Sequence, residues 1–338
     1  MNKIRLKRYP TISVLIATFN SHNTINMCLE SVRNQEYPQN KIEIILADGG
    51  SKDDTLQVGK KFGATVIKVP PKLQNAEYNK GVGLKKTKGE LVLMIDHDNV
   101  LPTNQWLKEM VYPLLDDPKI VGVETLRYHY EPTYSLLDRY FALFGAGDPV
   151  AYYLGKSDRM SYITDKYNLL GRAVSKGTYY KVTFTPKSVS TIGANGFLIR
   201  REILMNNARV TPEDFYHIDV NIDLINKGYN TYAFAKNDII HFTGYNKISR
   251  FLMRKKLFME QFYVQKLENR RYSVYEKGDT IKLLLFILYA ATLVKPTIDA
   301  LRGYSRIKDS AWLFHPILSF ALLCIYGYTT IKGYIKSV

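Results

Sequence analysis

Roughly the first hundred residues alternate between continuous apolar runs and amphipathic stretches. The runs at 11–18 and 41–47 are rich in β-branched residues, which is typical of strands buried inside a parallel sheet. Two further strands are predicted at 64–69 and 90–96. Helical spacing is found between them at 23–34 and 75–87. Strands that alternate with helices predict βαβ units, and therefore an α/β fold with a mostly parallel, Rossmann-like sheet flanked by helices.

The pattern weakens and then returns further along the chain. Between 126 and 190, Tyr and Gly are frequent and no period persists, which predicts an insertion that acts as a lid or faces a substrate. A glycine-rich turn, a strand and a helix follow at 193–204, then a helix near 219–228 and strand segments up to 244. We therefore expect one large domain over 1–245, with the insertion included.

The C-terminal part of the chain has a different composition. Tyr245 to Tyr272 carries eight Lys and Arg against two Glu, interleaved with large apolar side chains, which predicts a basic amphipathic helix at a membrane interface over 246–275. Beyond it, Leu283 to Val294 offers 12 uncharged residues and Ala311 to Ile331 offers 21. We expect membrane-associated helices over 276–338, either as a hairpin or as re-entrant helices, with a buried helical subdomain as the alternative.

Charge narrows the choice of partners. The net charge of +16 calls for an anionic partner, and the basic residues gather at Lys3 to Arg8, at Lys247 to Arg271 and around the C-terminal apolar segments. No zinc-finger, RRM-like or basic-zipper pattern accompanies them, so we expect an anionic membrane surface and no nucleic acid. Cys28 and Cys324 lie far apart, and the basic N-terminus leads into a strand without an apolar signal segment, so we expect the first domain in the cytoplasm.

Polar clusters follow three of the predicted strands, at the point where each strand ends: Thr18 to Asn20, Asp48 to Gly50 and Asp96 to Asp98. In parallel sheets, ligands collect at the carboxyl ends of the strands. Asp96 and Asp98 place two carboxylates one residue apart in a turn, and such oxygen ligands suit Mg²⁺ or Mn²⁺. The alternative is a solvated turn whose acids cap a helix.

Six segments in this order resemble family 2 glycosyltransferases: VLIATFN (14–20), ADGGSKDDT (47–55), KGELVLMIDHDN (88–99), GANGFLIRRE (193–202), Lys-Gly-Tyr (227–229) and IIHFTG (239–244). The resemblance covers roughly residues 10–245 apart from the insertion. It implies a GT-A catalytic domain over 1–245, a nucleotide-diphosphate sugar donor, a divalent cation and inversion at the anomeric carbon.

The resemblance also implies roles for single residues. The nucleotide contacts would be Thr18, Asn20, Asp48, Gly49 and Asp96. Asp98 would be the principal metal ligand, with Asp96 and His241 in its ligand shell; a core histidine bonded to backbone is the alternative for His241.

Inverting transfer needs a general base for the acceptor. The family usually offers an Asp in a Glu-Asp pair, and Asp219 stands in that place, although Ile218 replaces the usual Glu. Glu213-Asp214 is the alternative, in a context more typical of a helix start.

A membrane-resident acceptor, such as a polyprenyl phosphate or a lipid-linked glycan, agrees with the apolar C-terminal segments. Arg139, Arg159 and Arg172 in the insertion are candidate phosphate contacts. Processive family members add a Gln-x-x-Arg-Trp motif, and neither tryptophan, Trp106 nor Trp312, lies in one, so we expect transfer of a single sugar. A non-catalytic sugar-nucleotide-binding or scaffolding protein on the same fold is the alternative function.

Overall fold

The computed structural model describes residues 4–245, 247–260, 270–273 and 275–337. The chain divides into two compact units. The first, which we call the sheet unit, comprises Met1–His129 and Leu170–Phe242, and the second, the helical unit, comprises Tyr130–Leu169 and Thr243–Val338.

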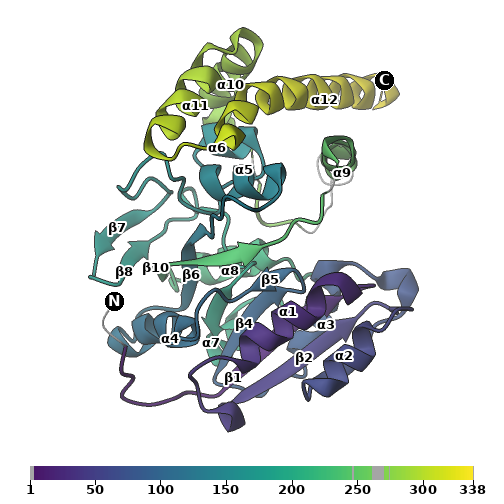
Figure 1. Ribbon diagram of the computed structural model, residues 1–338, viewed down its shortest axis with the longest axis vertical. Coiled ribbons are helices and arrows are strands. Elements are labelled where there is room, and N and C mark those ends of the chain that lie inside the picture. The colour runs from purple at the N-terminus through teal and green to yellow at the C-terminus, as the bar shows by residue number, and fades with distance from the viewer. Residues whose placement is uncertain (1–3, 246, 261–269, 274, 338) are drawn as a thin grey trace. The chain divides into compact units, whose positions relative to one another are not determined.

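The sheet unit is built on one mixed sheet with the strand order β3-β2-β1-β4-β9-β6-β10-β8-β7, and β5 pairs with β10 (Figure 1). The strands are β1 Ile12–Thr18, β2 Ile42–Asp48, β3 Thr65–Lys68, β4 Leu91–Asp96, β5 Asn99–Val100, β6 Gly122–Tyr128, β7 Arg172–Ser175, β8 Tyr179–Thr183, β9 Phe197–Arg200 and β10 Thr231–His241. Pairing is parallel among β3, β2, β1 and β4, and β9 is antiparallel to both of its neighbours. This arrangement confirms the predicted α/β fold.

The helices of this unit lie on both faces of the sheet. They are α1 His22–Arg33, α2 Thr55–Lys61, α3 Ala76–Leu84, α4 Trp106–Asp116, α7 Arg201–Asn207 and α8 His217–Asn226. A Cβ atom at Gly59 in α2 would contact Leu46, whereas one at Gly83 in α3 would contact Ile45 and Ala47. Side chains alternate between the faces of a strand, so α2 and α3 cover opposite faces of β2. All seven residues of β1 are buried as a result.

The helical unit contains α5 Leu136–Phe144, α6 Pro149–Leu154, α9 Ile248–Met259, α10 Thr280–Thr292, α11 Val294–Arg306 and α12 Phe314–Ser337. Tyr140 and Phe144 of α5 share a buried core with Phe251, Trp312 and Leu318. The predicted domains placed α5 and α6 in the large N-terminal domain. The structure groups them with the C-terminal helices instead, because the apolar face of α5 is buried against those helices. Part of the predicted helix at 246–275 lies outside the described residues.

Several buried polar side chains inside the helical unit are paired with one another. The two ring nitrogens of His315 lie 2.8 Å from the hydroxyl of Tyr140 and 3.0 Å from that of Tyr153, which also donates to Asp299 at 3.1 Å. Asp309, 3% exposed at its side chain, accepts hydrogen bonds from Arg139. Buried polar groups are tolerated only when they are bonded in this way, so these contacts fix how the helices pack.

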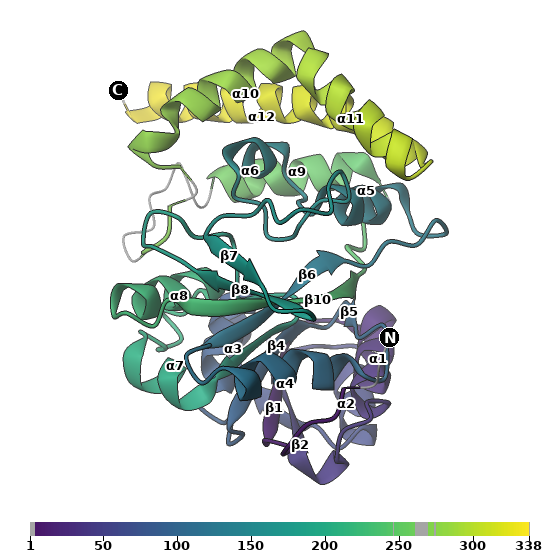
Figure 2. The ribbon, with the colours of Figure 1, turned by 90° about the vertical axis from the view of Figure 1, so that its left-hand side faces the viewer.

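One described helical segment, Ser310–Gly333, is long and apolar enough to cross a bilayer. The α10 and α11 helices are long and apolar enough to cross a bilayer only when they are taken together. The chain bends by 81° between them, at Leu293 (Figure 2). Large apolar side chains are exposed along these helices, including Ile281, Leu284, Leu288, Leu301, Ile317, Phe320 and Ile331. The predicted apolar C-terminal helix is therefore present, and its membrane contact stays a prediction.

We expect Gly303→Ala to destabilise the helical unit. A Cβ atom at this position of α11 would lie 2.3 Å from the indole ring of Trp312, and such overpacking costs about 1–3 kcal/mol. The control is Gly327→Ala in α12, where no atom lies within 4 Å and the better helix propensity of Ala stabilises by up to about 1 kcal/mol. Thermal unfolding in detergent should show a lower melting temperature for the first variant only. Equal melting temperatures would contradict this packing.

Candidate active site

Strand register brings three of the predicted site residues together at one edge of the sheet. Thr18 at the end of β1 pairs with Asp48 at the end of β2, and Ala17 pairs with Asp96 at the end of β4. Because these strands are parallel, their carboxyl ends lie side by side. The expected cluster therefore forms from segments that are far apart in the sequence.

The loops after β1 and β2 are bonded to each other through Asp48 and Ser51. The carboxylate of Asp48, which is fully buried, accepts hydrogen bonds from the hydroxyls of Thr18 (3.1 Å) and Ser51 and from the backbone N–H groups of Gly50 and Ser51 (2.9 Å each). Asn20, at φ 49°, accepts a hydrogen bond from the N–H of Lys52 at 2.9 Å. A left-handed Asn persists only where neighbours hold it, so these two loops form one preorganised surface.

Gly49 allows two segments to approach this surface closely. A Cβ atom here would lie 2.0 Å from Cγ of Gln74 and 3.1 Å from Nδ2 of Asn79. Asn79 itself is 1% exposed, and neither atom of its amide has a hydrogen-bond partner among the described residues. Leaving such a group unsatisfied costs about 1–3 kcal/mol, which makes Asn79 a candidate ligand contact beside Gly49.

The Asp96–Asp98 turn is fixed by the short strand that follows it. Asn99 accepts a hydrogen bond from the N–H of Asp96 at 2.8 Å, and it pairs with His241 in the antiparallel β5–β10 ladder. The N–H of Phe242 donates to the carbonyl of Asp98 at 3.0 Å. This ladder brings Nε2 of His241 to 3.7 Å from Oδ2 of Asp98, so the predicted pair of ligands is assembled.

Asp98 and His241 suit a divalent cation. Oδ1 of Asp98 is buried and has no hydrogen-bond partner among the described residues. Burial raises the pKa of Asp98, but the imidazole of His241 outweighs this effect and holds the pKa below its usual value. Two ligand atoms at about 2.1 Å from one ion lie at most about 4.2 Å apart, so the observed separation is compatible with shared coordination.

The described residues provide no cluster of three or more candidate metal ligands. An ion at Asp98 and His241 would therefore complete its shell with substrate oxygens and water, as Mg²⁺ commonly does at phosphate sites.

Asp96 has a partner that the sequence did not reveal. Nζ of Lys80, on α3, lies 2.6 Å from Oδ1 of Asp96, and the Lys80 side chain is 1% exposed. Burial lowers the pKa of Lys80, but the carboxylates of Asp96 and Glu77 raise it above its usual value. One oxygen of Asp96 is thus already bonded to a fixed cation, and its contacts with a metal or a nucleotide stay predictions.

Glu77 lies one turn before Lys80 and binds the start of α8. Its two oxygens accept hydrogen bonds from the N–H of His217 (2.8 Å) and from Nδ1 of the same residue (2.7 Å). Burial raises the pKa of Glu77, but His217 and Lys80 outweigh it and lower the pKa to about 2. The carboxylate is therefore ionised at neutral pH, and it also satisfies the positive end of the helix.

The two predicted bases occupy different surroundings. Asp219 lies in the first turn of α8 and is 0% exposed. Asp214 accepts a hydrogen bond from Thr211 at 2.8 Å in a turn that precedes α8, whereas its sequence context was typical of a helix start.

The 193–196 loop links the two sides of this edge. The N–H of Gly193 donates to the buried Glu124 at 2.9 Å, and a Cβ atom at Gly193 would lie 2.4 Å from the carbonyl oxygen of His217. Asn195 donates to the hydroxyl of Tyr128 at 3.3 Å, and the ring of Tyr128 lies 5.5 Å from that of His241. The loop therefore contacts the start of α8 on one side and Tyr128, a neighbour of His241, on the other.

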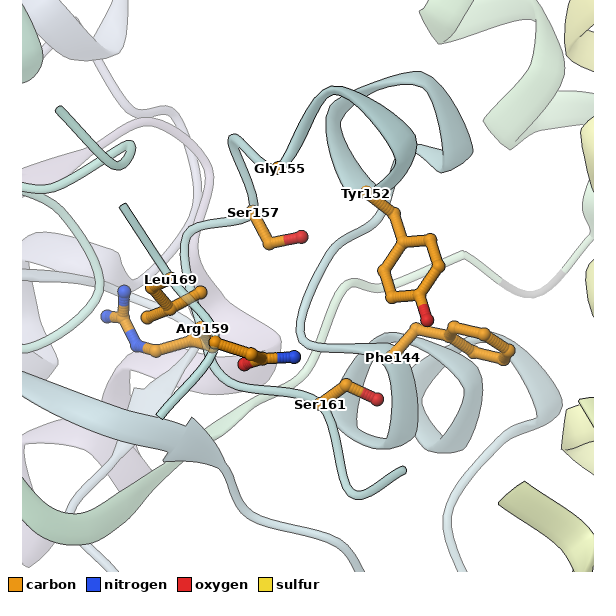
Figure 3. Close-up of a pocket in the computed structure, with 8 residues that line it drawn as sticks. Phe144, Tyr152, Gly155, Ser157, Arg159, Ser161 and Leu169 are labelled. Atoms are coloured by element: carbon orange, nitrogen blue, oxygen red, sulfur yellow. The ribbon is translucent and has the colours of Figure 1, made fainter. Parts of the chain in front are cut away.

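The three candidate arginines are divided between the two units. Arg172 is exposed in β7 of the sheet unit, whereas Arg139 and Arg159 belong to the helical unit. Arg139 is bound to Asp309. Arg159 is 1% exposed and extends away from the side chains of Phe144 and Tyr152 (Figure 3). Their interpretation as phosphate contacts stays a prediction.

The sequence analysis did not identify three residues of this edge: Lys80, Glu77 and His217. Glu77 and Lys80 are three residues apart on a predicted helix, which places them on one face, but an acid and a base at this spacing are also common on solvated surfaces. His217 stands next to the predicted Ile218-Asp219 segment. Only the packing of α3 against the end of β4 and the start of α8 shows that these side chains face the site.

We expect Lys80→Met to destabilise the sheet unit by about 2–4 kcal/mol, because it leaves the Asp96 carboxylate without its buried partner. The double variant Lys80→Met/Asp96→Leu removes both charges and should recover part of this loss. Thermal unfolding of the single and double variants measures the coupling. Additive losses would show that the pair does not stabilise the fold.

We expect Asp98→Asn to weaken Mn²⁺ binding by about tenfold or more without lowering the melting temperature, because it removes an ionised oxygen that is unpaired in the folded chain. The control is Glu36→Gln, which removes a carboxylate bonded to Lys108 and Asn104. Calorimetric titration with Mn²⁺ measures both. Unchanged affinity in the Asp98 variant would exclude this residue from the metal site.

Comparison with known proteins identifies the family and the fold of the chain. The family "Glycosyl transferase family 2" matches residues 13–204. A dolichyl N-acetyl-alpha-D-glucosaminyl phosphate 3-beta-D-2,3-diacetamido-2,3-dideoxy-beta-D-glucuronosyltransferase of Methanococcus voltae is 25% identical over 96% of this chain and 97% of its own length. Glycosyltransferase AglE of Haloferax volcanii is 28% identical over 37% of this chain and 41% of its own length.

A solved structure has the same fold over nearly the whole chain. The mannosyltransferase PcManGT of Pyrobaculum calidifontis, solved with GDP-Man and Mn²⁺, superimposes with a TM-score of 0.53 at 14% identity and covers 97% of this chain and 88% of its own. The predicted GT-A fold is thereby confirmed. Since the family match spans more than half of the chain and includes the strand ends that carry Thr18, Asp48 and Asp98, this protein belongs to glycosyl transferase family 2 and is a glycosyltransferase.

Proposed function

We propose that this chain transfers one sugar from a nucleotide-diphosphate donor to a hydroxyl group of a lipid-linked sugar, with inversion at the anomeric carbon and with Mg²⁺ or Mn²⁺ as cofactor. The observation that carries the proposal is Asp98 beside His241, with a buried Oδ1 that has no hydrogen-bond partner among the described residues, at the sheet edge that also holds the bonded loops after β1 and β2. In a nucleotide-diphosphate sugar, the base and ribose would contact these loops, and the diphosphate would coordinate the ion.

The roles of single residues follow from their places. Thr18, Asn20, Asp48 and Gly49 present the surface for the nucleotide, and the amide of Asn79 adds a donor and an acceptor beside Gly49. Asp98 and His241 hold the ion, and a bound divalent cation stabilises the negative charge that develops on the departing diphosphate. Lys80 binds Asp96 and holds it in place, so the turn is preorganised before the donor arrives.

The proposed class of acceptor is inferred from the Methanococcus relative and from the exposed apolar side chains of the helical unit. The name of the Methanococcus relative describes transfer to position 3 of an N-acetylglucosamine on dolichyl phosphate, and the alignment spans almost all of both chains. The helical unit exposes large apolar side chains on α10 to α12, and the described part of its basic segment, α9, exposes Met253, Leu257 and Phe258. These surfaces bind the chain to an anionic membrane at its cytoplasmic side, where such an acceptor resides.

The first test measures nucleoside diphosphate release from UDP-, GDP- and dTDP-sugars by detergent-purified full chain. Dolichyl phosphate-linked N-acetylglucosamine is the acceptor, and Mn²⁺ is compared with EDTA. We expect release from one donor that rises at least tenfold with acceptor and is lost in EDTA.

Asp98→Asn should lower this release by about 10²-fold or more, while Glu36→Gln retains it. Release that is unaffected by EDTA would contradict metal dependence. Release that does not depend on the acceptor lipid would contradict the proposed acceptor.

A further inference from the structure

We propose that the sheet unit has a second ligand site, a cavity at the start of β4, which binds a phosphate group carried on a small aliphatic group. The cavity has a volume of about 580 Å³, within the range of about 300–1,000 Å³ that is usual for small-molecule sites. All of the residues that line it belong to the sheet unit. The inference goes beyond the proposed function and does not depend on it, because no residue of the candidate active site lines this cavity.

The length of β4 separates the two sites. Leu91, at the start of the strand, lines the cavity, whereas Asp96, at its end, lies in the candidate active site. Between these two residues a strand spans about 17 Å. Leu91 pairs with Arg200 at the end of the antiparallel β9, so the cavity lies where β4 begins and β9 ends. A small ligand bound there does not reach the Asp96–Asp98 turn.

Four segments that are distant in the sequence form the walls. They are the segment before β1, the start of β4, the end of α4 with the turn after it, and the junction of β9 with α7. Hydrogen bonds join three of these segments at Glu90. Its carboxylate accepts from the N–H of Thr11 at 3.2 Å, its own N–H donates to the hydroxyl of Thr11 at 2.9 Å, and its carbonyl accepts from the N–H of Arg201 at 3.0 Å. The cavity is therefore built into the fold.

Arg200 and Arg201 keep guanidinium nitrogens that are not used within the fold. Arg200 donates from Nε to the carbonyl of Ile120 at 2.8 Å and from Nη2 to that of Leu114 at 2.6 Å, which fixes its position. Its Nη1 has no hydrogen bond among the described residues. The guanidinium of Arg201 donates from Nε to the hydroxyl of Thr87 at 3.0 Å, and neither of its Nη nitrogens has a partner in the described parts of the chain. Guanidinium groups with free nitrogens bind phosphate oxygens well.

Positive charge in the cavity exceeds negative charge. The charged residues that line it are Arg8, Lys88, Arg200 and Arg201 on one side of the balance and Glu90 and Glu202 on the other. Arg8 is bonded to Glu90 at 2.6 Å. Within the residues that the structure describes, no carboxylate forms an ion pair with Lys88, Arg200 or Arg201. An anionic ligand would supply the charge that these three side chains lack.

The surroundings of Arg200 also favour an anion. Burial and the guanidinium of Arg8 lower the pKa of Arg200, and the carboxylate of Asp117 opposes this effect only in part. A partly buried cation beside a second cation is electrostatically unfavourable in the free protein. A phosphate group that contacts Arg200 would relieve this repulsion.

The rest of the lining is aliphatic. It is made by Pro10, Leu91, Leu114, Leu115, Pro118 and Ile203. None of the described residues that line the cavity is aromatic, whereas nucleobases commonly stack on aromatic rings. An aliphatic wall beside unpaired cations suits a phosphate ester with a short aliphatic group better than it suits a nucleotide.

The test measures binding of hexyl phosphate, inorganic phosphate and adenosine monophosphate by calorimetric titration of the detergent-purified full chain. EDTA is present, so that the proposed metal site holds no ion. The variant is Lys88→Gln/Arg201→Gln. The matched control is Lys60→Gln/Lys61→Gln, which removes two exposed cations of α2 that do not line the cavity.

We expect hexyl phosphate to bind the wild type and the control equally, and to bind the variant about tenfold or more weakly, because two of the phosphate contacts are lost. It should bind the wild type about threefold or more tightly than inorganic phosphate or adenosine monophosphate does. The single variant Lys88→Gln serves as a check on folding, because the Lys88 side chain is exposed and has no hydrogen bond among the described residues. It should bind hexyl phosphate about threefold or more weakly without a change in melting temperature.

Vesicles of phosphatidylcholine with phosphatidic acid distinguish the two sources of such a phosphate. Weaker sedimentation of the Lys88/Arg201 variant than of the control would assign the group to a membrane lipid, and equal sedimentation would assign it to a soluble ester.

Three results would overturn the inference. The first is the lack of saturable binding of hexyl phosphate to the wild type. The second is equal affinity of folded Lys88→Gln/Arg201→Gln and the control for hexyl phosphate. The third is binding of adenosine monophosphate that is tighter than that of hexyl phosphate, which would contradict the aliphatic class of ligand.

Discussion

The ion pair between Lys80 and Asp96 is the interaction on which the arrangement of the site depends. A lysine with 1% exposure is costly unless its ammonium group is paired, and Asp96 provides that partner at 2.6 Å. Through this contact α3 is bonded to the end of β4. One turn earlier on α3, Glu77 is bonded to the start of α8. The Asp96–Asp98 turn and the start of α8 are therefore both held by one helix, although they come from distant parts of the sequence.

The fold was predictable because its signals are local and repeated. Continuous apolar runs correctly predicted the buried parallel strands, and the ends of those strands correctly predicted where Thr18, Asp48 and Asp96 meet. The pairing of His241 with Asp98 was predictable only through the family resemblance, because it depends on a two-residue strand that no periodicity can reveal. The contacts of Lys80, Glu77 and His217 were not predictable, because spacing gives the face of a helix but not what that face meets.

The region from 126 to 190 shows the same limit at the level of domains. Its weak period predicted an insertion, but the sequence could not show that 130–169 would be grouped with the C-terminal helices. This grouping results from the packing of Tyr140 and Phe144 against Trp312 and Leu318. The sequence analysis had assigned Trp312 and Leu318 to a membrane segment. Apolar residues on an amphipathic helix indicate that a partner exists, whereas its identity is decided by shape and by buried polar pairs such as Tyr140 with His315.

Of the three neighbouring acids at the sheet edge, two are bonded to basic side chains of the fold and one is left available for a ligand. Of the carboxylates of Glu77, Asp96 and Asp98, the first is bonded to His217 and the second to Lys80, and only Asp98 keeps a buried oxygen without a hydrogen bond among the described residues. Asp98 is therefore a better candidate for binding an ion than its two neighbours. The proposed transfer needs charge stabilisation at the leaving group, and because the other two acids are bonded within the fold, Asp98 is the one that remains for this task.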